Sequence, residues 1–139
     1  MYNEALMKRA VQLARKVKKE GEGDPFGCVI ARNGEVVAEE GNKGFKTFDP
    51  TTHAELEAVR TASRFLKTQD LSDCELYTSG EPCPMCEAAI NWSGIPVVYT
   101  AKTAKEAENA GLLPVPETTY ELQYKPLQDQ TLDPYLDEQ

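Results

Sequence analysis

At 139 residues the chain is long enough for one domain with a buried core, and 40% hydrophobic with 27% charged residues is typical of globular proteins. The formal net charge of −8 argues against a nucleic-acid partner, because proteins that bind nucleic acids usually carry a basic face. No apolar run can span a membrane and no leader opens the chain, so we expect a cytoplasmic protein without a membrane contact.

The first half of the chain predicts one helix and a hairpin. Asn3 can cap a helix with apolar side chains at three- and four-residue spacing, and Gly21 begins the stretch that ends it. Asn33 and Gly34 are typical of a two-residue hairpin turn between two antiparallel strands. The expected elements are a helix up to about residue 20, strands over 26–31 and 35–38, and a loop over 41–49.

The second half alternates helices and strands. Thr51 or Thr52 can cap a helix, and Pro84 can open another because proline favours the first helical position. The expected elements are helices over 53–66, 84–92 and 103–110 and strands over 74–78, 96–100 and 118–124.

This order of elements predicts an α/β fold. Helices that alternate with strands cover both faces of a sheet, which gives a three-layer α/β/α sandwich with a mixed five-stranded sheet. We expect a single domain over residues 1–139. Residues 112–139 then form a C-terminal segment, for which a surface tail and a cover over the site are the two alternatives.

Two short pieces of the sequence carry the chemistry. His53 and Glu55 place an imidazole and a carboxylate two residues apart, and Cys83 and Cys86 place two thiols with two residues between them. Three of these groups are good zinc ligands, and three protein ligands leave the fourth position open for a water. Glu55 is then free to carry the proton of that water. The pattern predicts one catalytic Zn²⁺ per chain.

The other cysteines have a simpler interpretation. Cys28 and Cys74 lie in expected strands without ligand spacing, so they are expected to be small buried core residues. A non-catalytic module with a structural zinc is the alternative, because structural sites are closed by four ligands and either thiol could provide the fourth. The number of sulfur ligands discriminates between the two.

The segments around these pieces resemble a known family. They are DPFG at 24–27, Asn42, DPTTHAE at 49–55 and YTSGEPCPMC at 77–86. A His-x-Glu followed by Pro-Cys-x-x-Cys is similar to the zinc nucleobase deaminases of the cytidine/deoxycytidylate deaminase superfamily. Within it, the chain looks most like the bacterial guanine deaminase branch. The resemblance covers most of the chain up to about Gly111, and the remainder matches poorly.

The resemblance implies a reaction and further site residues. It implies hydrolytic deamination, most closely of guanine to xanthine and ammonia, with His53, Cys83 and Cys86 on zinc and Glu55 as proton shuttle. From spacing alone Asn42 is a turn residue, whereas the resemblance makes it a ligand of the substrate base. The residues expected to contact substrate are Asn42, Phe26, Ala54 and Pro82.

Several alternatives stay open from the sequence. The substrate could be adenosine in transfer RNA, or cytosine or a triazine, because the pocket and not the zinc set selects the ring. The acidic composition favours a small nucleobase over RNA. A homodimer is expected, with Trp92 and the apolar face of its helix as part of the interface, although from sequence alone the same residues could be core.

Overall fold

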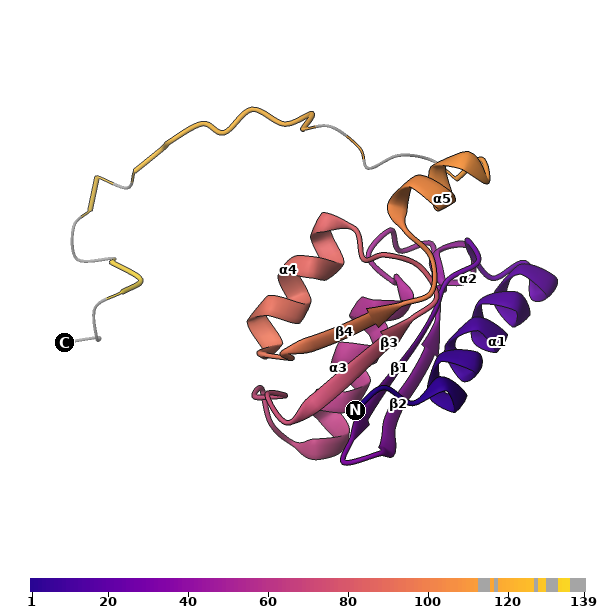
Figure 1. Ribbon diagram of the computed structural model, residues 1–139. Helices are drawn as coiled ribbons and strands as arrows, with labels where there is room; N and C mark the ends of the chain where they lie inside the picture. Colours follow the sequence, from indigo (N-terminus) through magenta and orange to yellow (C-terminus); the bar gives the residue numbers. More distant parts are fainter. Residues whose placement is uncertain (113–115, 117, 127, 130–132, 136–139) are drawn as a thin grey trace.

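The computed structural model describes residues 1–112, 116, 118–126, 128–129 and 133–135. After an initial helix and hairpin two helices follow in succession, and strands and helices then alternate along the chain (Figure 1). The elements are α1 (Glu4–Glu20), β1 (Gly27–Arg32), β2 (Glu35–Gly41), α2 (Gly44–Thr47), α3 (Ala54–Leu66), β3 (Cys74–Thr78), α4 (Pro84–Ser93), β4 (Val97–Thr100) and α5 (Ala104–Asn109).

The strands form one mixed sheet in the order β2-β1-β3-β4. β1 pairs antiparallel with both β2 and β3, whereas β3 and β4 are parallel and are joined through α4. α1 covers one face of the sheet, and α3 and α4 lie together on the other (Figure 1). The predicted α/β/α arrangement with a mixed sheet is therefore confirmed.

Each face of the sheet has its own apolar core. Met7 and Ala10 of α1 pack with Val29 and Tyr77 on one side. On the other side α3 contributes a row of small side chains, Ala54, Ala58 and Ala62, which lets this helix lie close to the sheet. This close packing brings the first turn of α3 to the end of the sheet at which β2 and β3 end.

The local sequence signals in the first half of the chain have the structures that they predict. The side chain of Asn3 accepts a hydrogen bond from Ala5 N, and Gly21 ends α1 in the left-handed conformation at φ 68°. Asn33 and Gly34 both have positive φ, at 52° and 81°, as a type I′ hairpin turn requires. β2 extends three residues beyond the expected 35–38, because its pairing with β1 continues to Gly41.

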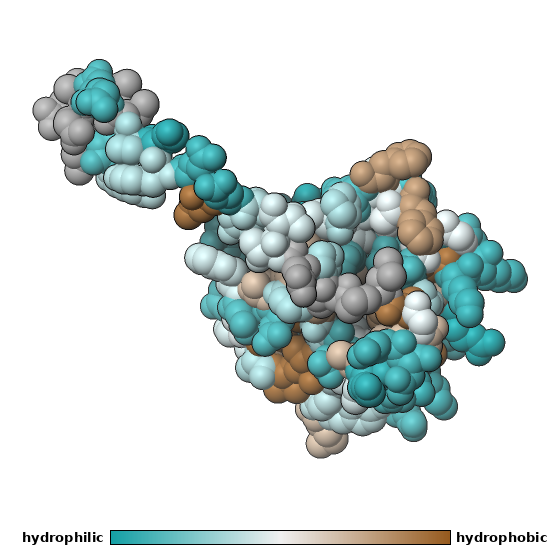
Figure 2. Space-filling model, turned by 90° about the horizontal axis from the view of Figure 1, so that it is seen from above, coloured by the Kyte–Doolittle hydropathy of each residue, from teal (hydrophilic) through white to brown (hydrophobic). Residues whose placement is uncertain are grey.

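The prediction of a fifth strand over 118–124 is wrong. Residues 118–124 carry no strand, and within the described part of the chain β4 pairs only with β3. The described residues over 118–126 are exposed and extend away from the body of the protein (Figure 1 and Figure 2). Alternation alone cannot form a strand without an adjacent edge to pair with. Parts of the expected segment 112–139, among them 113–115 and 136–139, lie outside the described residues.

Two further expectations concern burial and membranes. Cys28 and Cys74 are fully buried free thiols, as predicted. None of the helices in the described part of the chain combines the length and the apolar content that crossing a bilayer requires.

Candidate active site

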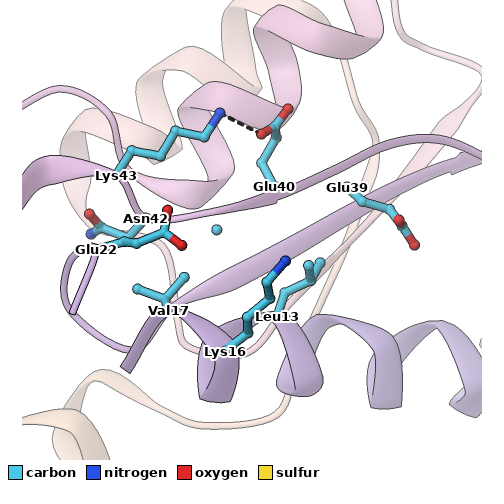
Figure 3. Close-up of a pocket in the computed structure, with 9 residues that line it drawn as sticks. Leu13, Lys16, Val17, Glu22, Glu39, Glu40, Asn42 and Lys43 are labelled. Atoms are coloured by element: carbon cyan, nitrogen blue, oxygen red, sulfur yellow. Dashed lines mark ion pairs between the residues drawn. The ribbon is translucent and has the colours of Figure 1, made fainter. Parts of the chain in front are cut away.

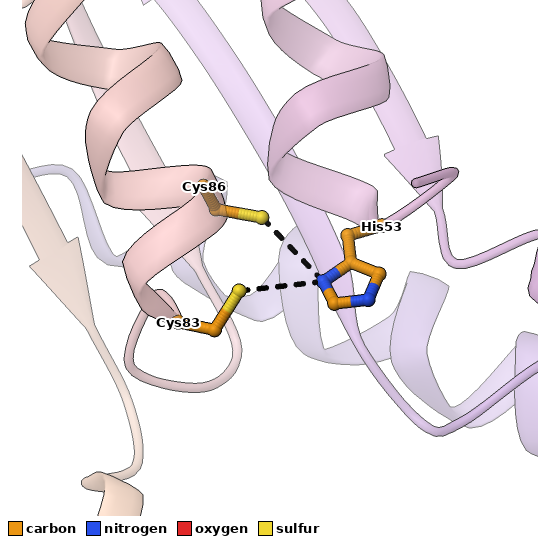
Figure 4. A group of neighbouring side chains, drawn as sticks. All are labelled: His53, Cys83 and Cys86. Carbon is orange, nitrogen blue, oxygen red and sulfur yellow. Dashed lines mark hydrogen bonds between the residues drawn. The ribbon is translucent and has the colours of Figure 1, made fainter. Parts of the chain in front are cut away.

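Three potential metal ligands meet where α3 and α4 begin. Nδ1 of His53 lies 3.6 Å from the Sγ atoms of both Cys83 and Cys86. The three ligand atoms lie within 4.8 Å of one another, and the side chains point toward a common centre (Figure 4). The structure thus brings together all three residues that the sequence predicted as ligands.

The chain places His53 through a turn that fixes the segment before it. The carboxylate of Asp49 accepts hydrogen bonds from the backbone N and the hydroxyl of Thr51, at 2.8 and 2.7 Å. The hydroxyl of Thr52 donates to the carbonyl of Asp49 and shares a second hydrogen bond with Thr47. Because these hydroxyls are used within the turn, neither threonine caps α3 as expected; His53 itself is the N-cap residue.

The two cysteines are placed by the start of α4. Cys83 is the N-cap residue and Pro84 occupies the first helical position, so Cys86 follows one turn later on the same side. Cys86 is fully buried and Cys83 is half-buried. The positive end of the helix dipole and the nearby N–H groups favour thiolate at both positions.

The thiols and the imidazole share their protons. Hydrogen bonds with Cys86 and then His53 lower the pKa of Cys83, which favours its thiolate form. The hydrogen bond with Cys83, followed by burial, raises the pKa of Cys86. The hydrogen bond with Cys83 also raises the pKa of His53. A cluster that favours a thiolate is well suited to a divalent cation, which would displace the remaining protons.

Glu55 stands apart from this cluster but within its electrostatic reach. Its side chain is only 4% exposed, and desolvation by burial is the main reason that its pKa is raised to about 7. Its own backbone N–H lowers that pKa, the Cys83 thiolate raises it further, and His53 lowers it. Glu55 is therefore a buried carboxyl that can hold or release a proton near neutral pH.

The residues predicted to contact substrate lie around the same end of the sheet. Ala54 is fully buried as the first residue of α3, and Pro82 is half-buried directly before Cys83. Phe26 precedes β1, and its carbonyl accepts a hydrogen bond from Asn42 N at 3.0 Å. Asn42 is 6% exposed. The four residues thus come from three separate loops and the start of α3.

Gly80 is a contributor that sequence reasoning missed. A Cβ atom at this position would lie 2.6 Å from Cε1 and 2.9 Å from Cδ1 of Phe26, so the ring rests directly on the Gly80 backbone. The segment that leads to Cys83 therefore fixes the position of the Phe26 ring. Gly80 lies in the YTSGEPC segment, but its contact with a residue 54 positions earlier has no local signal.

The part of the chain that matches a known family includes all the site residues described above. Residues 1–102 match the family described as the cytidine and deoxycytidylate deaminase zinc-binding region. The chain belongs to this family. It is therefore a deaminase-family protein, of the class of hydrolases that act on C–N bonds.

Relatives with known structure or function include two kinds of deaminase. The guanine deaminase of Bacillus subtilis (strain 168) is 45% identical over 111 residues, which cover 80% of this chain and 71% of that protein. An X-ray structure of a guanine deaminase from the same species matches with a TM-score of 0.83 and 39% identity, covering 92% of this chain and 88% of that chain. The tRNA-specific adenosine deaminase of Aquifex aeolicus (strain VF5) is 38% identical over 106 residues, covering 76% and 70%.

The donor set of this deaminase-family site fits a zinc ion. One imidazole nitrogen and two sulfurs are ligands that zinc prefers, and Cys28 and Cys74 do not belong to the group. Among the described residues the cluster has three ligands, which is the number that leaves a position open for a water. This arrangement favours a catalytic zinc over the structural-zinc module.

Proposed function

We propose that the chain deaminates guanine hydrolytically: guanine and water give xanthine and ammonia, with zinc as cofactor. The observation that carries the proposal is the buried Glu55 carboxyl beside a three-ligand His53, Cys83 and Cys86 cluster. The 45% identity to a guanine deaminase supports this base as the substrate.

The protein residues divide the chemical work. Zinc held by His53, Cys83 and Cys86 supplies Lewis acidity and lowers the pKa of a bound water toward neutrality. Glu55 takes the proton of the attacking water on a carboxylate oxygen and passes it to the leaving amino group. Burial suits this exchange, because it raises the pKa of a carboxyl that must first accept and then donate a proton.

The surrounding loops hold the base. The Phe26 ring forms a wall of the pocket, Asn42 offers its amide to an edge of the heterocycle, and Ala54 and Pro82 contribute backbone groups beside Glu55 and Cys83. Two backbone hydrogen bonds that hold these positions together support this assignment. Asn42 N donates to Phe26 O, and Lys43 N donates to Thr52 O immediately before His53. An amide suits a nucleobase edge because it combines donors and an acceptor.

A small nucleobase is favoured over transfer RNA. RNA-binding enzymes neutralise several phosphates with basic side chains, and this chain has 15 basic against 23 acidic residues. The identity to a tRNA adenosine deaminase nevertheless makes RNA the substrate class that a test must include.

Ammonia release tests the proposal directly. The zinc-loaded protein is assayed with guanine, guanosine, adenine, cytosine and an unmodified transfer RNA, beside a Glu55→Gln variant. We expect turnover of guanine, and we expect Glu55→Gln to lower kcat by about 10²- to 10⁴-fold with zinc content unchanged, because the proton carrier is lost.

The possible outcomes separate the parts of the proposal. Turnover of another ring would refute guanine as the substrate and keep the role of Glu55. A Glu55→Gln variant with wild-type kcat would refute the proton-transfer role. Adenosine deamination in transfer RNA, with a rate that falls steeply with salt, would replace the nucleobase by RNA.

We also propose that the enzyme is a homodimer that pairs through α4. Trp92 is 90% exposed on this helix, and Ala88 and Asn91 line a shallow hollow of about 380 Å³ beside it. An exposed tryptophan next to a depression is typical of an interface anchor. Light scattering on Trp92→Ala and on the wild type tests this, and a wild-type monomer at all concentrations would refute it.

A further inference from the structure

Asn42 lies at a junction between the Phe26 loop and α3. Its backbone N donates to Phe26 O, and the next residue, Lys43, donates its N–H to Thr52 O at 2.9 Å. The Lys43 ammonium also pairs with Glu40 at 2.8 Å (Figure 3), and Glu40 accepts a hydrogen bond from Thr61 of α3 at 2.7 Å. The backbone of Asn42 is therefore firmly connected to both sides of the site.

The side chain of Asn42 is held in one orientation. Its Oδ1 accepts a hydrogen bond from Gly44 N at 2.8 Å. The reversed amide would place an NH₂ group against that N–H, two donors facing each other, so the assignment of oxygen and nitrogen follows from the partner. One of the two lone pairs of Oδ1 is thus already used by the protein itself.

The NH₂ group of Asn42 remains available. No hydrogen bond from Nδ2 is formed to any of the described residues, and this part of the chain contains no fully buried side-chain nitrogen or oxygen without a partner. Nδ2 is therefore reachable by solvent, and it can donate to a ligand. Held in this way, Asn42 offers its NH₂ group as a donor in one fixed orientation.

The space that this orientation needs comes from Gly23. A Cβ atom at Gly23 would overlap Oδ1 of Asn42 and would lie 2.9 Å from its Cγ and 3.0 Å from its carbonyl oxygen. The φ angle of Gly23 lies outside the left-handed range, so its backbone conformation does not require glycine. The reason for a glycine here is the room that Asn42 occupies.

The backbone around Gly23 cannot easily move away. The carbonyl of Glu22 accepts hydrogen bonds from Phe45 N and Lys46 N at 3.0 and 3.2 Å, and Glu22 N donates to Val17 O at 3.1 Å. The side chain of Glu22 also pairs with Lys46 at 3.4 Å. An added methyl group would therefore displace the Asn42 carboxamide and not the loop that carries Gly23.

A hollow next to Asn42 can accept the displaced carboxamide. A hollow of about 180 Å³ lies between α1 and β2 and is bordered by Val17, Glu22, Asn42 and Lys43 (Figure 3). Because this space adjoins Asn42, a methyl group at Gly23 is expected to reorient the amide without unfolding the protein.

We propose that Gly23 is a positioning residue for the substrate: it leaves the room in which Oδ1 of Asn42 accepts from Gly44 N, and this bond orients the NH₂ group of Asn42 toward the bound base. The site then selects a heterocycle that presents an acceptor, a ring nitrogen or a carbonyl oxygen, at this edge. The proposal rests on the proposed function in one respect, namely that Asn42 contacts the substrate.

A double-mutant cycle tests whether Gly23 acts through Asn42. Gly23→Ala, Asn42→Ala and the double variant are compared in KM and kcat/KM for guanine, with zinc content and Tm measured in parallel. We expect Gly23→Ala to raise KM and lower kcat/KM by about ten- to a hundredfold, as the loss of a buried hydrogen bond does. In the Asn42→Ala background the same substitution should change kcat/KM by less than about twofold.

A matched control separates positioning from stability. Gly21→Ala adds the same methyl group two residues earlier, where it meets nothing within 4 Å but strains a left-handed φ of 68°. This variant should lose stability and keep its kinetic constants. Equal losses of kcat/KM from Gly23→Ala with and without Asn42 would overturn the proposal.

The amide resonance of Gly44 gives a readout that needs no turnover. Both Gly23→Ala and Asn42→Ala should shift this resonance and speed the hydrogen exchange of the Gly44 amide. Each substitution removes the Asn42 oxygen that accepts the hydrogen bond from Gly44 N. A wild type without activity on guanine that still shows both shifts would refute guanine as substrate and support the placement of Asn42 by Gly23. A Gly44 amide unchanged in Gly23→Ala would overturn the proposal at any level of activity.

Discussion

Burial of Glu55 has a measurable effect on the stability of the zinc-free protein. The carboxyl has an ordinary pKa of 4.5 in an unfolded chain, and burial raises its pKa to about 7 in the folded protein. Between these two values the unfolded chain has released a proton that the folded protein keeps. The free energy of unfolding therefore falls as pH rises through this window.

The size of the effect follows from the shift. Each pKa unit corresponds to about 1.36 kcal/mol, so a rise from 4.5 to about 7 corresponds to about 3 kcal/mol. The stabilising contribution of Glu55 is complete below about pH 4.5 and is lost above about pH 7. Glu55→Gln carries no ionisable group, so relative to the wild type this variant should gain about 3 kcal/mol between about pH 4.5 and about pH 8.

Urea unfolding of the metal-free protein measures this difference. Wild type and Glu55→Gln are titrated with urea at several pH values in the presence of a chelator and a reductant. Ionisable groups far from Glu55 contribute equally to both proteins and cancel in the comparison, whereas His53 and the two thiols interact with Glu55 and add a smaller difference of their own. A stability difference that stays constant within about 0.5 kcal/mol across this range would refute the reasoning that Glu55 is strongly desolvated.

Three further substitutions test the site and its support. Cys86→Ser should weaken zinc binding by more than about a hundredfold in competition with a chelator, since a buried thiolate ligand is lost; wild-type affinity would contradict this ligand assignment. Gly80→Ala should destabilise the protein by about 1–3 kcal/mol in urea, because its Cβ would press on the Phe26 ring, and an unchanged midpoint would show that the ring is free to move. Leu76→Ala should cost about 2–5 kcal/mol, since Leu76 is fully buried in the core beneath α3, and a loss below about 1 kcal/mol would contradict this packing.

Features with a local physical cause could be predicted from the sequence. The Asn3 cap, the Asn33-Gly34 turn and the opening of α4 at Pro84 each depend on neighbours within a few residues. The ligand cluster was predictable for another reason: zinc chemistry restricts which residue types can serve, and His53 is the single histidine of the chain.

Features that depend on distant contacts could not be predicted in this way. α2 has four residues and forms where Phe45 N and Lys46 N donate to Glu22 O, more than 20 positions away in the sequence. The expected strand over 118–124 has the alternation of a strand, but its sequence does not show whether an edge is near. The space that Gly23 leaves for Asn42 likewise depends on two loops that only the fold brings together.

Because the ligands lie at the starts of two helices, the rate of metal exchange depends on how the protein moves at these two positions. His53 precedes α3 and Cys83 precedes α4, 30 residues later, so a bound ion would join the starts of two helices. Cys86 is fully buried whereas His53 and Cys83 are half-buried, so the sulfur of Cys86 is the ligand that solvent reaches last. The rate at which an isotopically labelled zinc leaves the protein would then report how often the buried Cys86 sulfur becomes accessible.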